Sequence, residues 1–64
     1  MRIVEPMTGN DIMALRATFG LTQEHLAHRI GVTANTVARW ERGEIQITKM
    51  VENSIWWLEE KLRA

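Results

Sequence analysis

Apolar residues recur along the chain at the spacing of α-helices, in segments separated by glycine. The first segment follows Thr8, a favoured N-cap residue, and has an acid three positions later at Asp11, as in a capping box. Three apolar residues of this segment share one face of a helix: Ile12, Leu15 and Phe19. Gly20 can take the left-handed conformation that ends a helix. The pattern therefore predicts a helix between Thr8 and Gly20.

Two shorter helices are predicted between residues 22 and 43, joined by a tight turn. Both begin at a threonine suited to capping, namely Thr22 and Thr33. Both end at a glycine, namely Gly31 and Gly43. In each helix an apolar residue before the cap can contact one four positions after the cap, in the pairs Leu21 with Leu26 and Val32 with Val37. Two short helices in this arrangement predict a helix-turn-helix motif.

The last segment predicts a longer helix, residues 48–62. Its apolar stripe, expected to face the core, contains Val51, Ile55, Leu58 and Leu62. Met50 and Trp57 lie on one flank of this stripe and are also expected in the core. Trp56 lies instead among charged residues, namely Glu52, Glu59, Glu60 and Arg63. We therefore expect Trp56 to be exposed, on a surface that contacts a partner.

The whole chain, residues 1–64, is expected to form one all-α domain of four to five helices. A domain of this size buries only about 60% of the surface that its unfolded chain exposes. Its hydrophobic content of 45% is too high for a disordered chain, and the absence of cysteine excludes disulfides and thiolate metal ligands. The apolar runs are too short to span a membrane, and the N-terminus lacks the apolar stretch of a signal peptide. We therefore expect a cytoplasmic protein.

The net charge of zero argues against a protein that coats nucleic acid by bulk electrostatics, since such domains are strongly basic. The charges are nevertheless unevenly distributed. Of the eight basic residues, four fall between residues 29 and 49: Arg29, Arg39, Arg42 and Lys49. That stretch contains only two acids, Glu41 and Glu44, whereas other acids collect in the last segment. Any surface for nucleic acid is therefore expected within this stretch.

The span from Leu21 to Gly43, LTQEHLAHRIGVTANTVARWERG, resembles the helix-turn-helix of the Cro/C1-type (XRE-like) transcriptional regulators. The resemblance covers roughly residues 8–48 and depends on several residues at their expected spacing: Gln23, Ala27, Gly31, Val37 and the run Trp40-Glu41-Arg42-Gly43. It implies a compact lambda-repressor-like domain that binds double-stranded DNA, with the helix of residues 34–42 in the major groove. The last segment departs from the family because one helix replaces two short ones, which leaves the dimer arrangement open.

The resemblance also implies which residues contact DNA. Four residues at the start and on the outer face of the reading helix are expected to meet base edges: Ala34, Asn35, Thr36 and Arg39. Asn35 can bind adenine N6 and N7, and Arg39 can bind guanine O6 and N7 or a phosphate. Phosphate contacts are expected from Gln23, Thr33, Arg42 and the backbone N–H of Gly43. A partly buried ion pair between Arg16 and Glu41 is implied to tie the first helix to the end of the reading helix.

His25 and His28 lie three positions apart and can share a helix face, but no cysteine or third ligand accompanies them. We therefore expect no metal and no other cofactor. His28 lies close enough to the turn to contact a phosphate when it is protonated. The sequence offers no nucleophile–base set and no glycine-rich phosphate loop, so we expect neither an enzyme nor a small-molecule site.

These features predict a prokaryotic or phage transcriptional regulator, a repressor or autoregulator that binds a palindromic operator as a homodimer. Trp56, together with Ile3 and Val4 of the N-terminal arm, is expected to form the dimer surface. One alternative is a DNA-binding antitoxin or regulatory subunit whose main role is to hold a small protein partner. The other is an adaptor that has kept the fold without DNA binding.

Overall fold

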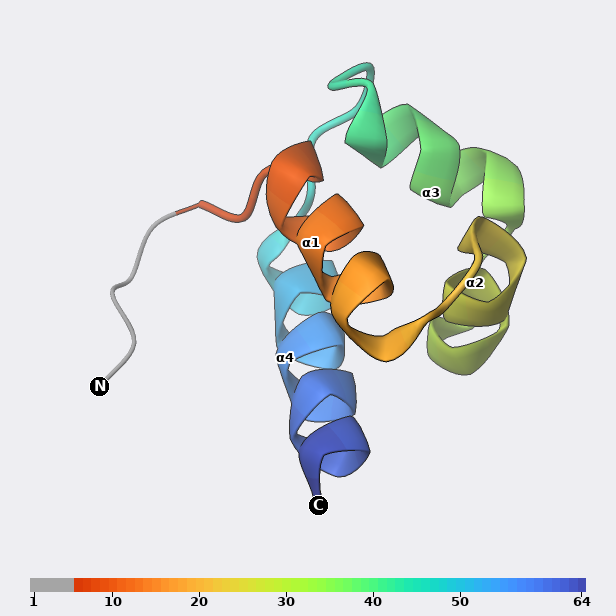
Figure 1. Cartoon of the computed structure of the whole chain (residues 1–64). Coiled ribbons are helices and arrows are strands. Elements are labelled where there is room, and N and C mark those ends of the chain that lie inside the picture. Colours follow the sequence, from red (N-terminus) through yellow and green to blue (C-terminus); the bar gives the residue numbers. More distant parts are fainter. Residues whose placement is uncertain (1–5) are drawn as a thin grey trace.

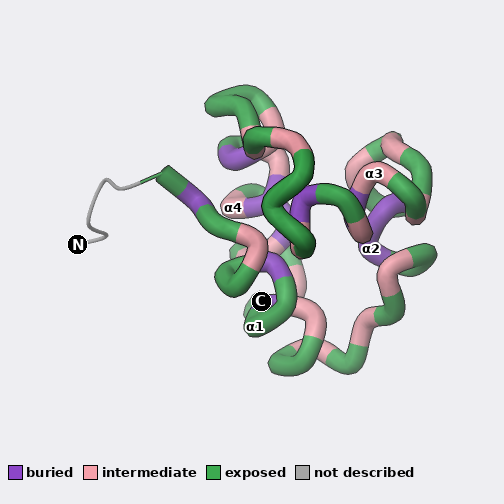
Figure 2. The backbone as a smooth tube through the Cα atoms, turned by 90° about the horizontal axis from the view of Figure 1, so that it is seen from above, coloured by how far each residue is buried: buried purple, intermediate pink, exposed green. Residues whose placement is uncertain are grey.

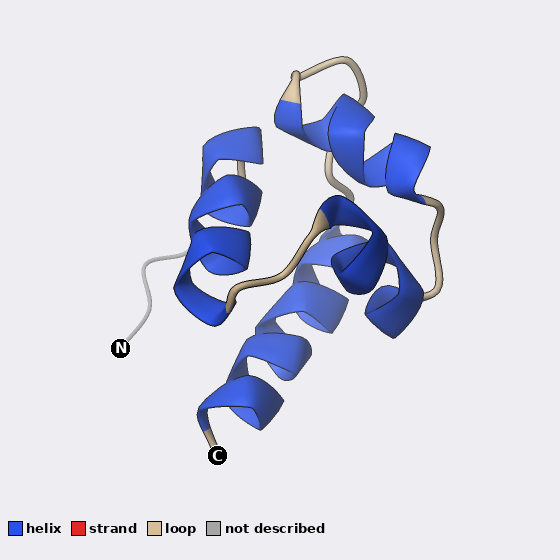
Figure 3. Cartoon of the chain, turned by 45° about the vertical axis from the view of Figure 1, so that its right-hand side comes forward, coloured by secondary structure: helices blue, strands red, loops and turns tan. Residues whose placement is uncertain are grey.

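The computed structural model describes residues 6–64 and contains four helices and, within that part of the chain, no strand. In chain order they are α1 (Gly9–Phe19), α2 (Gln23–Ile30), α3 (Ala34–Glu41) and α4 (Lys49–Arg63) (Figure 1). Short loops join α1 to α2 and α2 to α3, and a longer loop leads to α4 (Figure 3). The all-α prediction is confirmed. Among the helices of residues 6–64, none is long and apolar enough to cross a membrane.

Each helix begins after a threonine, because the threonine side chain satisfies a backbone N–H group that the first turn leaves without a partner. In all four helices the capping hydroxyl accepts a hydrogen bond from the N–H three residues later; the caps are Thr8, Thr22, Thr33 and Thr48. At Thr8 the capping box is complete, since the Asp11 carboxylate accepts a hydrogen bond from the Thr8 backbone N–H at 2.9 Å. The predicted starts of the helices are confirmed.

The core is built from buried residues on every helix and on the segment before α1 (Figure 2). Its buried apolar side chains are Met7, Ile12, Leu15, Leu26, Ala27, Val37, Trp40, Ile55 and Leu58. Ala27 is only 2% exposed on α2, where its small side chain lets α3 pack closely. Val37 and Trp40 cover the inner face of α3. The core therefore fixes which face of α3 remains available to a ligand.

The start of α1 lies directly against the end of α3. A Cβ atom added at Gly9 would lie 2.5 Å from the carbonyl oxygen of Trp40 and 2.7 Å from that of Glu41. Those two oxygens belong to the backbone and cannot move aside as a flexible side chain could. Only glycine fits at this position, and the contact fixes the C-terminal end of α3 relative to α1.

Helix α4 is rotated relative to the orientation that its sequence predicted. Ile55 and Leu58 are buried as expected, but Trp57 is 58% exposed and Met50 is 79% exposed. The prediction that Met50 and Trp57 lie in the core was wrong. Trp56, expected to be exposed among charged residues, is half-buried and packs against the core.

The rotation of α4 has a polar cause. The Glu52 carboxylate is buried, and its Oε2 accepts a hydrogen bond from the Met7 backbone N–H at 2.7 Å. Its other oxygen lies 3.2 Å from the Lys49 ammonium nitrogen. These contacts draw the Glu52 side of α4 toward the segment that precedes α1. Trp56 lies one turn further along the same side and therefore also turns inward.

Candidate nucleic-acid interface

The face of α3 that points away from the core is polar. The inner face of α3 is buried in the core, since Val37 is 0% and Trp40 is 4% exposed. Two of the predicted base-reading residues, Asn35 and Arg39, are exposed, and the other two are half-buried. Asn35 and Arg39 are four positions apart, so they lie on the same side of the helix. Figure 1 shows α3 at the edge of the molecule.

The half-buried pair, Ala34 and Thr36, lies in the first turn of α3. The hydroxyl of Thr33 accepts a hydrogen bond from the Thr36 backbone N–H at 3.2 Å and lies 3.0 Å from the Thr36 hydroxyl. The two hydroxyls thus form one polar unit at the N-terminal end of the helix. Because a helix N-terminus carries a partial positive charge, this end suits a phosphate.

A groove of about 450 Å³ runs between the N-terminal ends of α2 and α3. Its lining residues come from three places in the chain: Arg16, Gly20, Leu21, Thr22, Gln23, Glu24 and Ala34. The groove brings Gln23 of α2 beside Ala34 of α3, although eleven positions separate them in the sequence. Two of the predicted DNA-contacting residues therefore share one surface.

Arg16, Gln23 and Glu41 form a hydrogen-bonded network that joins α1, α2 and α3. The Arg16 guanidinium donates from Nε to Glu41 Oε2 at 2.7 Å and from Nη2 to Glu41 Oε1 at 3.0 Å. Its Nη1 donates to the Leu21 carbonyl at 3.2 Å. Gln23 Nε2 also donates to Glu41 Oε1, at 3.0 Å. The ion pair implied by the family resemblance is thus present, with a glutamine added to it.

The network matters for stability because its charged side chains are largely buried. The side chain of Glu41 is 6% exposed and that of Arg16 is 23% exposed. Burial alone would raise the pKa of Glu41, but hydrogen bonds from Arg16 and Gln23 outweigh it and hold that pKa below its ordinary value. The hydrogen bond to Glu41 raises the pKa of Arg16. Both groups are therefore charged in the folded protein at neutral pH.

The network also limits what Gln23 can offer to a phosphate. Its amide nitrogen donates to Glu41, so one side-chain N–H is committed within the protein. Gln23 is the first residue of α2, where backbone N–H groups have no intrahelical partner. A phosphate contact at Gln23 would therefore use the backbone N–H or the second side-chain N–H.

Helix α3 ends in a Schellman motif, in which Arg42 is the C-cap. Gly43 has a φ of 75°, in the left-handed region that favours glycine. The Gly43 N–H donates to the Trp40 carbonyl at 3.1 Å, and the Glu44 N–H donates to the Arg39 carbonyl at 2.9 Å. The first of these bonds occupies the N–H for which the family resemblance implies a phosphate contact, so a phosphate at Gly43 would have to compete with the Trp40 carbonyl.

The same turn brings Glu44 against two arginines predicted to contact DNA. Glu44 Oε2 lies 2.6 Å from Arg42 Nε, and Glu44 Oε1 lies 3.3 Å from Arg42 Nη2. Glu44 Oε1 also lies 3.5 Å from Arg39 Nε. The hydrogen bonds between Arg42 and Glu44 lower the pKa of Glu44 and raise the pKa of Arg42. Arg39 and Arg42 therefore both have an anionic partner within the protein.

Comparison with known proteins identifies the family. A family model described as helix-turn-helix matches residues 12–51, more than half of the chain. The chain belongs to the Cro/C1-type (XRE-like) helix-turn-helix family. It is also 38% identical over 63 residues to a Bacillus subtilis (strain 168) protein named "Uncharacterized HTH-type transcriptional regulator YgzD", with 81% of this chain and 96% of that protein covered. The family is one of DNA-binding transcriptional regulators and is not enzymatic.

In this helix-turn-helix domain, α2 and α3 are the two helices of the motif, and α3 is the second. His28 is exposed in the last turn of α2, one turn before the loop that leads to α3. Among the described residues, no three His, Asp or Glu side chains are grouped so that they could hold a metal ion.

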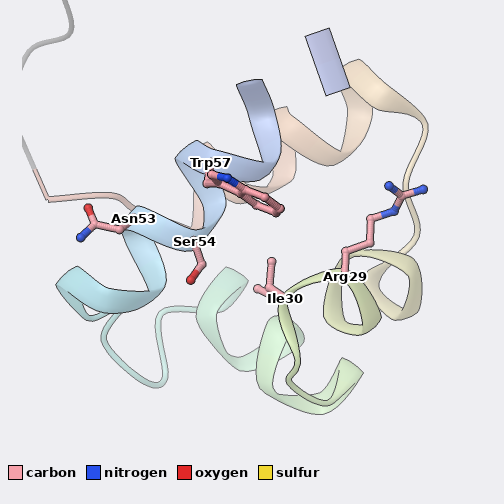
Figure 4. A pocket seen from close by; sticks show the side chains of 5 residues that line it. All are labelled: Arg29, Ile30, Asn53, Ser54 and Trp57. Carbon is pink, nitrogen blue, oxygen red and sulfur yellow. The ribbon is translucent and has the colours of Figure 1, made fainter. Parts of the chain in front are cut away.

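The partner surface predicted for this regulator differs from the apolar surface that the fold exposes. Trp56 is half-buried, and Ile3 and Val4 lie outside the described residues. The exposed apolar side chains of α4 are instead Met50 and Trp57. Trp57 reaches toward Ile30 of α2 across a groove of about 350 Å³ that Arg29, Asn53 and Ser54 also line (Figure 4).

Three residues of the helix-turn-helix domain proved more important than their sequence suggested: Gly9, Glu44 and Glu52. Gly9 falls within the region of family resemblance, but no local pattern reveals that a backbone approaches it. Glu44 follows the glycine that ends α3 and has two arginines within five positions, so its pairing could have been anticipated. Glu52 gave no such signal, because its backbone partner at Met7 is 45 positions away.

Proposed function

We propose that this helix-turn-helix regulator is a repressor or autoregulator that reads the major groove of a palindromic operator with α3. The observation that carries the proposal is the division of α3 into two faces. Val37 and Trp40 anchor one face in the core, while Asn35 and Arg39 are exposed on the other. The B-DNA major groove admits an α-helix, and an exposed polar face can then reach the base edges.

Base reading is assigned to four residues, and each has chemistry that suits it. The Asn35 amide can bind adenine N6 and N7, and the Arg39 guanidinium can bind guanine O6 and N7, each contact contributing about 1–3 kcal/mol of discrimination. Ala34 is small enough to leave space or to contact a thymine methyl group. Thr36 can serve a base or a phosphate, because its hydroxyl lies beside that of Thr33.

Phosphate binding is assigned to the two ends of α3 and to α2. Thr33 at the N-terminal end and Arg42 at the C-terminal end would bracket the reading helix on the DNA backbone. Gln23 would add a contact from the start of α2, and His28 one from its last turn when protonated. With so few cations engaged, the affinity is expected to fall only moderately with salt.

Gel-shift titrations with Arg39→Ala test base reading. On the preferred site we expect binding to weaken by about 10- to 100-fold, the loss of one bidentate base contact. On a random-sequence duplex the loss should be small, since Arg39 then acts only as a cation. Arg63→Ala is the matched control, because it removes the same charge from an exposed position at the far end of α4. If Arg39→Ala binds every sequence as well as the wild type, α3 does not read bases through this residue.

The palindromic operator requires two copies, and the exposed side of α4 is the surface that we assign to their contact. Met50 and Trp57 are seven positions apart, so they lie about two turns apart on one side of α4. A two-fold axis beside Ser54 would set Met50 of one copy against the partner's Trp57. Together they offer roughly 300 Å² of apolar surface per copy, below the ~800 Å² per partner of a stable interface. The dimer is therefore expected to be weak in solution and to form on the operator.

Sedimentation with and without operator DNA tests this assignment. The wild type is expected to be monomeric alone and to bind the operator as two copies, and Trp57→Lys should bind as one copy with lower affinity. Met13→Lys, at an apolar side chain that is 39% exposed on α1, is the control and should behave as the wild type. A wild type that binds as a single copy would overturn the homodimer. Copurification of a second small protein that is lost in Trp57→Lys would instead support the antitoxin or regulatory-subunit alternative.

A further inference from the structure

Glu44 lies next to both arginines that the proposed function directs to DNA. Its carboxylate contacts Arg42 Nε at 2.6 Å and Arg39 Nε at 3.5 Å. The side chains are accessible, with 45% of Arg39, 54% of Arg42 and 46% of Glu44 exposed. A phosphate that approaches this end of α3 therefore meets two arginines that already have an anion.

The Glu44 carboxylate is not needed to end α3. The Schellman turn is made by the backbone N–H groups of Gly43 and Glu44 and by the positive φ of Gly43. A negative charge at a helix C-terminus is moreover unfavourable, because that end of the helix dipole is itself negative. The two arginines offset this cost in the free protein. When they turn to DNA, the carboxylate is left beside both the helix C-terminus and a phosphate.

The competition between Glu44 and DNA for Arg39 differs between a random duplex and the operator. On a random duplex, Arg39 has no base to bind, and a phosphate must draw it away from Glu44. At the operator, Arg39 gains a two-point contact with guanine that a single contact of 3.5 Å does not match. Because Arg39 leaves Glu44 fully at the operator and only in part on a random duplex, removal of the carboxylate should raise the affinity for the operator at least as much as the affinity for a random duplex.

We propose that Glu44 is an internal anion that competes with DNA for Arg39 and Arg42 and so lowers the affinity of α3 for DNA. It lowers affinity for DNA of any sequence, because both arginines must leave it before they bind a base or a phosphate. The proposal rests on the proposed function, since it requires that α3 binds DNA through these arginines. The net charge of zero fits this role, because a regulator with weak non-specific attraction depends more on its base contacts.

The test compares Glu44→Gln with the wild type on two labelled duplexes, a random-sequence pool and the preferred site from selection. Glu44→Gln should bind the random pool about three- to tenfold more tightly and the preferred site by at least the same factor. Between about 50 and 200 mM salt, its log–log salt slope on the random pool should steepen by about one phosphate contact. Glu44→Ala should behave in the same way.

Glu60→Gln is the matched control, because it makes the same charge change at an exposed position near the far end of α4. Circular dichroism and thermal unfolding establish that each variant is folded. A gain confined to the random pool, no gain beyond that of Glu60→Gln, or weaker binding would each overturn the role of Glu44. Absence of DNA binding by the wild type would overturn the proposed function as well. A guanine preference that Arg39→Ala abolishes, together with unchanged affinity of Glu44→Gln for both duplexes, would overturn the Glu44 proposal alone.

Discussion

A buried charge pair holds the end of α3 in position. Arg16 and Glu41 are joined by two hydrogen bonds, and both side chains are mostly shielded from water. Gln23 adds a third donor to the same carboxylate. A carboxylate in such a site is stable only while its partners remain, so its removal and the removal of its partner have different consequences.

Arg16→Ala should destabilise the domain by about 2–4 kcal/mol, because it leaves the Glu41 carboxylate buried with only Gln23 as a donor. The loss should appear in urea or thermal unfolding. Arg63→Ala is the control: Arg63 is 65% exposed and pairs with Glu59 on α4, so its loss should cost less than about 1 kcal/mol. Equal effects of the two substitutions would contradict a structural role for the Arg16–Glu41 pair.

Two carboxylates make the fold sensitive to acid. The hydrogen bond from the Met7 N–H lowers the pKa of Glu52, and the hydrogen bonds from Arg16 and Gln23 leave the pKa of Glu41 lowered despite its burial. A lowered pKa in the folded state stabilises the fold above the ordinary carboxyl value of 4.5, and this stabilisation is lost as the pH falls through the folded value.

Urea unfolding as a function of pH should therefore show stability falling below about pH 4.5. Glu52→Gln keeps an oxygen that can accept from Met7 but cannot titrate, so its stability should fall less steeply over the same range. The unfolding free energies of the two proteins should converge as the pH approaches the pKa of Glu52 in the folded state. An unchanged acid slope in Glu52→Gln would contradict the assignment of this carboxylate.

At the scale of single helices, the ends of the helices could be predicted from the sequence. Which side of α4 faces the core could not. Each helix start depends on a threonine and an N–H three residues away, so a short stretch of sequence contains all the information. Helix α3 was predicted to end at Arg42 and ends one residue earlier, with Arg42 as its cap. The rotation of α4 depends on the Glu52–Met7 hydrogen bond, which joins distant parts of the chain. Trp56 and Trp57 are equally apolar, so their spacing alone could not choose between them.

Gly9→Ala tests the contact between α1 and α3. Its Cβ would overlap two backbone oxygens, so the end of α3 must shift, at a cost of about 1–3 kcal/mol or more. Asn10→Ala changes the next, exposed position of α1 and should be nearly neutral. Thermal unfolding measures both. A Gly9→Ala protein as stable as Asn10→Ala would show that the two helices are not in close contact.

For the whole molecule, the arrangement separates the proposed DNA surface from the proposed dimer surface. Helix α3 lies at one edge, and the groove beside Trp57 lies between α2 and α4 (Figures 1 and 4). The base-reading positions could be proposed from the family resemblance because they lie on one short helix. Glu44 and Gly43 could not be assigned in the same way, since their roles depend on how the chain turns after α3.

Selection from random duplex DNA, repeated with Arg39→Ala, tests the central claim most directly. The wild type should enrich a palindrome whose half-site centres lie about 10 base pairs apart, with a strongly preferred guanine in each half-site. Arg39→Ala should enrich the same palindrome without that guanine, while the positions assigned to Asn35 stay unchanged. Identical enriched sequences for the two proteins, or no enriched sequence for the wild type, would contradict the claim that α3 reads DNA.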